Sequence, residues 1–115
     1  MTIKRIDPNK LMSKAVIHGG MVYLSGLTAR DRSQSVQGQC RQILATIDDY
    51  LAQAGTDKSK LLSAQIWLTD IATWSEMNEV WVEWIDADNP PARATVEANL
   101  AVPDLSIEIM VTAAL

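Results

Sequence analysis

The stretch PPARATVEAN (residues 90–99), followed by LSIEIMV (residues 105–111), decides the fold that the sequence predicts. Apolar and polar residues alternate through both segments, which is the period of β-strands that bury one face. We therefore expect two strands to close the chain as a hairpin, turning at about residues 101–104. Arg93 lies inside the first of these strands rather than at a loop tip.

Arg93 is the residue whose position most favours chemistry. It shares a strand face with Thr95 and Glu97. An arginine fixed by a sheet can present its planar guanidinium to a carboxylate through two parallel hydrogen bonds. The alternative is a surface or interface arginine paired with Glu97 or Glu108, which is the commoner case when nothing else is known. The pattern alone leaves both interpretations open.

Glu108 is the second candidate, because it is flanked by Ile107 and Ile109 in a strongly apolar strand. Partial burial would make its carboxylate a proton acceptor or a holder of water. The alternative is an edge glutamate that reaches solvent. In a simple hairpin Glu108 pairs near Glu97, which places Arg93 about 13 Å further along the strand. If Arg93 and Glu108 cooperate, we expect them to do so across subunits.

The segments before this hairpin also predict strands. Residues 2–6 are β-compatible, and two apolar runs at residues 15–18 and 21–26 are joined by Gly19-Gly20, a strong signal for a β-hairpin. Residues 61–68 predict another strand. The polar residues 27–35 predict a solvated loop.

A first helix is predicted from about residue 36, where apolar residues recur at helical spacing as far as Leu51. Ser33 or Ser35 can cap its start, and Gly55 supplies a left-handed stop. Cys40 lies on the apolar stripe and is expected to be inert core.

A second helix is predicted by Thr73 and Glu76, which have the spacing of a capping box. Asn89-Pro90-Pro91 forbids its continuation. Its apolar stripe consists of Met77, Val80, Trp81 and Trp84. Together with Trp67 and Trp74, these tryptophans are expected to pack in the core or an interface rather than to stack on a cofactor.

The predicted order is one strand, two strands, a helix, a strand, a helix and two strands. This order favours an α+β fold with a mixed, six-stranded sheet and two helices packed on one face. Two helices cover only one face, so the other must be polar or buried by another copy of the chain. We therefore expect a homo-oligomer.

Composition narrows the possible functions. With 115 residues the chain is expected to form a single domain, residues 1–115. The net charge of −4 disfavours nucleic acid as a partner. One cysteine and one histidine, His18 at the predicted Gly-Gly turn, make a metal site improbable. The sequence has no apolar stretch typical of a secretory signal or a membrane span, so we expect a cytoplasmic protein that does not bind membranes.

Several short motifs follow one another nearly from end to end of the chain: residues 13–16, 22–26, 77–80, 91–97 and 106–109, with a terminal Ala113-Ala114. With these motifs in this order, the sequence resembles the Rid family of imine and enamine deaminases. The spacing between Arg93 and Glu108 matches the closing motif of that family. The resemblance implies a chorismate-mutase-like fold, a homotrimer and no cofactor.

The resemblance also implies roles for individual residues. Arg93 would bind the carboxylate of a 2-imino acid or enamine, and Glu108 would hold or activate the water that attacks the imine carbon. Ser25 and the backbone of Gly26 would line the same cleft between subunits, with Asn78 beside the arginine. The products would be a 2-ketoacid and ammonia.

Three positions depart from the family pattern: Met12 replaces a tyrosine, Leu27 a glutamine and Thr95 a cysteine. The first change removes a hydroxyl from the expected pocket, and the second would make its mouth more apolar. The sequence therefore leaves open an alternative function, a non-catalytic module that binds a small carboxylate metabolite on the same trimeric scaffold. A ribonuclease activity is disfavoured, because the chain is acidic and has no basic stripe.

Overall fold

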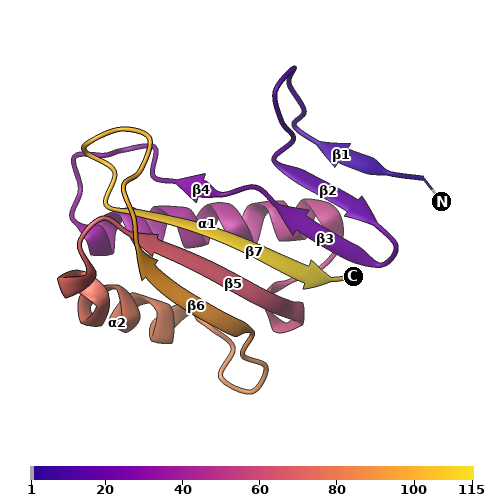
Figure 1. Ribbon diagram of the computed structural model, residues 1–115. Coiled ribbons are helices and arrows are strands. Elements are labelled where there is room, and N and C mark those ends of the chain that lie inside the picture. The colour runs from indigo at the N-terminus through magenta and orange to yellow at the C-terminus, as the bar shows by residue number, and fades with distance from the viewer. Residues whose placement is uncertain (1) are drawn as a thin grey trace.

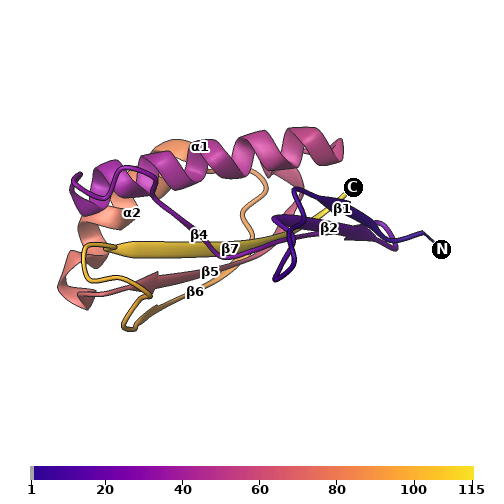
Figure 2. The same cartoon turned by 90° about the horizontal axis from the view of Figure 1, so that it is seen from above.

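The computed structural model describes residues 2–115, which form one mixed β-sheet with two α-helices on one of its faces (Figure 1, Figure 2). The helices are α1 (Val36–Ala54) and α2 (Trp74–Trp84). The strands are β1 (Lys4–Ile6), β2 (Ala15–His18), β3 (Met21–Leu24), β4 (Leu27–Thr28), β5 (Leu61–Leu68), β6 (Ala92–Glu97) and β7 (Ile107–Ala114). Short 3₁₀ turns, η1 (Lys58–Lys60) and η2 (Ile71–Thr73), precede β5 and α2.

The strand order is β1-β2-β3-β7-β5-β6, and β4 pairs separately with β7. The predicted α+β class, with two helices on one face of a mixed sheet, is confirmed. The sheet contains the six predicted strands and a seventh, β4, which lies in the segment predicted to be a loop. Gly19 and Gly20 have φ values of +59° and +78°, so the predicted Gly-Gly hairpin joins β2 to β3 through left-handed turn positions.

The predicted closing hairpin is wrong, because β5 lies between β6 and β7. β6 runs parallel to β5, and α2 provides the crossover that two parallel strands require. β7 instead pairs antiparallel with β5, and its inward side chains Ile107, Ile109 and Val111 are fully buried. The more apolar strand therefore takes the centre of the sheet, and β6 forms an edge.

The predicted capping residues are found in α1 but not in α2. Ser35 caps α1 by accepting a hydrogen bond from the Gly38 N–H, and Gly55 ends it at φ +88°, as predicted. The predicted capping box of α2 is wrong, because the Thr73 hydroxyl donates to the carbonyl of Asp70. The Asp70 carboxylate caps the preceding turn η2 instead.

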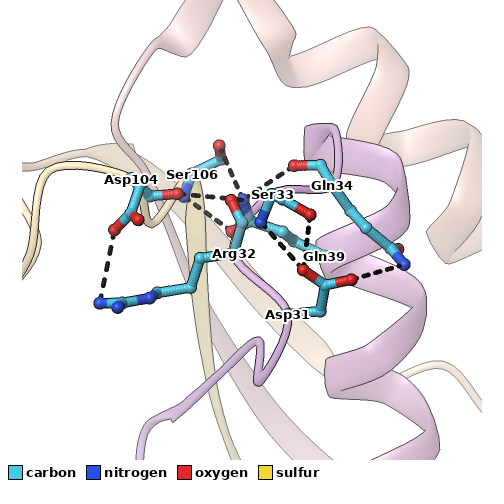
Figure 3. Close-up of polar contacts among 7 residues, drawn as sticks. All are labelled: Asp31, Arg32, Ser33, Gln34, Gln39, Asp104 and Ser106. Carbon is cyan, nitrogen blue, oxygen red and sulfur yellow. Dashed lines mark hydrogen bonds and ion pairs between the residues drawn. The ribbon is translucent and has the colours of Figure 1, made fainter.

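Gln39 is a buried polar residue that ties the start of α1 to the loop before β7 (Figure 3). Its Nε2 lies within hydrogen-bond distance of the Arg32, Gln34 and Asp104 carbonyls and the Ser106 hydroxyl. Its Oε1 accepts from the Ser106 N–H at 2.9 Å. This contact fixes the chain immediately before β7.

The sheet face away from the helices carries exposed apolar side chains. Tyr23, Val96 and Met110 are each more than 40% exposed in the single chain. Within residues 2–115, neither α1 nor α2 combines the length and apolar character needed to cross a bilayer.

Candidate active site

Arg93 extends from the edge strand β6 toward α2, on the helix-covered side of the sheet. Arg93 pairs in register with Ala64 of β5, and Ala64 pairs in turn with Val111 of β7. Ala64 and Val111 are both buried beneath the helices. The Arg93 Nη1 donates a hydrogen bond of 2.8 Å to the Oδ1 of Asn78 in α2. The family resemblance implies that Asn78 lies beside the arginine, and in the structure the two side chains are in contact.

Two tryptophans of α2 flank the same guanidinium. The Arg93 Cζ lies over the Trp74 ring at 5.6 Å from its centroid and over the Trp81 ring at 5.3 Å. Residues 74, 78 and 81 recur at intervals of four and three, so they share one face of the helix. Each ring attracts the cation through its negative π-face. The prediction that these tryptophans serve only as packing missed this role.

Burial lowers the pKa of Arg93, although a guanidinium stays charged at neutral pH. Within residues 2–115, the ion pair found is Arg32 with Asp104, at 3.4 Å. The Glu97 carboxylate accepts from the Ile71 N–H instead. The alternative in which Arg93 pairs with Glu97 or Glu108 is therefore not found in the single chain. A half-buried cation without a carboxylate partner is suited to an anionic ligand.

Glu108 lies on the opposite face of the sheet, since its neighbours Ile107 and Ile109 point into the core. It pairs with Thr28 of β4 and with Trp67 of β5, and it is half-buried. A Cβ atom added to Gly26 would collide with the Glu108 Oε2. The carboxylate therefore packs directly against the Gly26 backbone, which brings these two predicted site residues together.

Arg93 and Glu108 do not form one site within a single chain. Arg93 is level with Ala64, and Glu108 is level with Trp67, three residues further along β5. At usual strand rise and spacing, the two positions are about 14 Å apart. Their side chains also leave opposite faces of the sheet. The hairpin predicted a similar separation for a different reason. In the structure, the distance arises because β5 lies between β6 and β7.

Two other predicted site residues carry buried hydroxyls. The Ser25 Oγ and the Thr95 Oγ1 have no hydrogen-bond partner among residues 2–115. Thr95 lies two positions beyond Arg93 on the same strand, and thus on the same face. Buried hydroxyls are normally satisfied, so each of these has unused capacity for a ligand, a water or another subunit.

Leu27 and Met12, the two positions expected to shape a pocket between subunits, lie apart from Arg93 in the single chain. Leu27 is only 5% exposed, because its side chain packs in the core opposite Ile109, and with Gly26 it borders a surface hollow of about 530 Å³. Met12 is exposed in the loop between β1 and β2, where Asn9 holds its backbone. That loop follows the edge strand β1, and Arg93 lies on the other edge strand, β6.

The remaining candidates behave as predicted from the sequence. His18 is exposed at the end of β2. Cys40 is fully buried, and this burial raises the pKa of its thiol to about 12. The thiol is therefore a packing group and not a nucleophile.

The family model described as Endoribonuclease L-PSP matches residues 2–115. A RutC family protein from Haemophilus ducreyi is 42% identical over 113 residues, covering 98% of this chain and 97% of that protein. The chain belongs to the Rid family, also known as the YjgF family. A solved YjgF family member from Neisseria meningitidis has a TM-score of 0.96 at 39% identity, covering 99% of this chain and 95% of the other. A Rid family protein from Yersinia pestis has a TM-score of 0.85 at 31% identity, covering 94% and 90%.

Proposed function

We propose that this Rid family protein hydrolyses 2-imino acids and their enamine tautomers to 2-ketoacids and ammonia. The observation that carries the proposal is the half-buried Arg93 guanidinium. Asn78 and two tryptophan rings hold it, and no carboxylate of residues 2–115 pairs with it.

The reaction needs two groups held in place. Arg93 binds the substrate carboxylate, and Glu108 positions a water and accepts its proton as the oxygen adds to the imine carbon. Glu108 then returns this proton to the nitrogen, which gives a carbinolamine. When the C–N bond of the carbinolamine breaks, the hydroxyl proton moves to the nitrogen, so that ammonia and a 2-ketoacid are released. Because imines hydrolyse readily, fixing the substrate and the water supplies much of the acceleration. No step requires a metal or a cofactor.

The site is proposed to form between subunits of a homotrimer. Arg93 and Glu108 lie on opposite faces of one chain, so a neighbouring copy must bring its Glu108 to Arg93, or the reverse. The exposed Tyr23, Val96 and Met110 on the open face support self-association, because single chains rarely expose such a surface without a partner. Sedimentation should give the mass of a trimer, and a stable monomer would contradict the proposed site.

Turnover is tested by generating 2-iminobutyrate or 2-aminoacrylate in situ and following the release of ketoacid and ammonia. Arg93→Ala should abolish the acceleration over buffer and leave the oligomer intact. Arg41→Ala removes an exposed arginine of α1 and should change nothing. Retained activity in Arg93→Ala would exclude the carboxylate role of Arg93.

The same experiment separates the enzyme from a binding module. A binder would take up a 2-ketoacid at Arg93 without accelerating imine hydrolysis. The family description names an endoribonuclease, and RNA incubated with the same preparation tests that activity directly. The net charge of −4 favours a small anion held at one arginine over a polyanion.

A further inference from the structure

Trp74 occupies an unusual position, because its ring meets the Arg93 guanidinium on one side and solvent on another. It is 39% exposed, whereas Trp81, the second ring at the guanidinium, is only 6% exposed. Packing in the core accounts for Trp81. It does not account for a large aromatic side chain left open beside a cation.

An open hollow of about 500 Å³ adjoins this ring. It lies along the outer side of α2 and is lined by Trp74, Ser75, Asn78, Glu79, Val82 and Glu83. Asn78 both lines the hollow and accepts the hydrogen bond from Arg93. Arg93 does not itself line the hollow, but Trp74 and Asn78, which contact its guanidinium, form one wall of it. The volume of the hollow is within the range of roughly 300–1,000 Å³ that is usual for small-molecule sites.

We propose that Trp74 is a specificity-determining residue, which selects 2-imino acids with a long apolar or aromatic side chain. The inference rests on the proposed function, since it requires the substrate carboxylate to bind Arg93. Asn78 engages Nη1, and the remaining N–H groups of the guanidinium have no protein partner among residues 2–115. A carboxylate bound there places the substrate side chain beside the exposed indole.

The apolar part of the hollow sets the preference for size. Val82, at 62% exposed, continues the apolar wall one helical turn beyond Asn78. Each substrate methylene buried against this wall gains up to about fourfold in binding. A leucine-derived or methionine-derived substrate should therefore exceed the alanine-derived one by about tenfold in kcat/KM.

The acidic part of the hollow sets the preference for charge. Glu79 and Glu83 both line it and are exposed. A second carboxylate on the substrate would be repelled by these groups. The expected order is therefore large apolar first, small apolar second and dicarboxylate last.

The test compares the wild type with Trp74→Ala, Trp74→Phe and Ile71→Ala on imines derived from leucine, alanine and glutamate. Ile71 is the matched control, an exposed apolar residue near the start of α2 that does not line the hollow. Trp74→Ala should bring the leucine-to-alanine ratio of kcat/KM close to one, and Trp74→Phe should keep most of the ratio. Ile71→Ala should leave it unchanged. A uniform loss on all substrates would overturn the inference, because Trp74 would then act only on Arg93.

A binding measurement keeps this test separate from the proposed reaction. Calorimetric titration of the folded variants with 4-methyl-2-oxopentanoate, pyruvate and 2-oxoglutarate requires no turnover. The same order of affinity, lost in Trp74→Ala, supports the inference even if no imine is hydrolysed. An order led by pyruvate or 2-oxoglutarate, or binding of none of the three, overturns the inference, whereas the proposed reaction is decided separately by the turnover of the wild type.

Discussion

The Nη1 of Arg93 donates to the Oδ1 of Asn78 at 2.8 Å, which joins the edge strand β6 to the helix that crosses over to it. This bond uses one of the five N–H donors of the guanidinium. It orients the others without neutralising the charge, because an amide oxygen carries none. A carboxylate in place of the amide would form an ion pair with Arg93 and compete with an anionic ligand.

Asn78 substitutions should therefore separate orientation from charge. Asn78→Ala leaves the Arg93 Nη1 without its partner, and kcat/KM should fall about tenfold, since hydrogen bonds to charged groups contribute about 1.5–3 kcal/mol. Asn78→Asp restores the contact but pairs the cation, so KM should rise further than in Asn78→Ala. Steady-state kinetics on one imine measure both effects. Equal KM values in the two variants would contradict the view that Arg93 is held uncompensated for an anion.

Gly26→Ala should displace the Glu108 carboxylate. The added Cβ meets the end of a flexible side chain, so the protein can relieve the clash by moving that side chain rather than the backbone. We expect a fall in kcat of tenfold or more, comparable to that of Glu108→Gln, with a change in unfolding free energy below about 1 kcal/mol. Kinetics and urea unfolding of both variants provide the test. Full activity in Gly26→Ala would mean that the position of Glu108 is not critical.

The alternation of residues 92–97 and 107–111 predicted both closing strands but not their neighbours. Period-two patterning places Arg93 opposite Ala92 and Ala94 in its strand, and Glu108 opposite Ile107 and Ile109 in its own. In β7 the apolar side faces the helices, as the pattern predicts, whereas in β6 the apolar side is exposed and the side with Arg93 faces the helices. The pattern carries no information on which strands pair. The parallel crossover through α2 inserts β5 between the two strands, and a hairpin prediction cannot include that.

The tryptophans of α2 show a second limit of sequence reasoning. The spacing of Trp74, Asn78 and Trp81 is visible in the sequence, and it predicts a shared helix face. Whether that face meets apolar side chains or a cation depends on which residue of β6 lies beneath it. Pairing of Ala64 with Arg93 decides this, and it follows only from the strand register.

Cys40 should make the protein sensitive to alkali. Burial raises the pKa of the thiol from 9.0 to about 12, so the folded state keeps its proton while the unfolded state loses it. The stabilising contribution is complete below pH 9 and is lost as the pH rises toward 12, by up to about 1.4 kcal/mol per pH unit. Urea unfolding at several pH values should show a shallower decline for Cys40→Ala than for the wild type. Parallel declines would contradict this prediction.

Gln39→Leu should destabilise the fold, although leucine is close to glutamine in size. The substitution keeps the buried volume but removes the amide that accepts from the Ser106 N–H and donates to the loop carbonyls (Figure 3). Several polar groups then lose their partner in a buried setting, and we expect a loss of about 2–4 kcal/mol in unfolding free energy.

Gln42→Leu is the matched control for this change. The Gln42 amide also bridges helix α1 to the preceding loop, through the backbone of Asp31, but that loop residue is exposed and water can replace the bonds. Its cost should stay below about 1 kcal/mol. Because Ser106 lies two residues before Glu108, Gln39→Leu should also lower kcat, whereas Gln42→Leu should not. Equal losses of stability in the two variants would show that the contacts of Gln39 are no stronger than those of a surface amide.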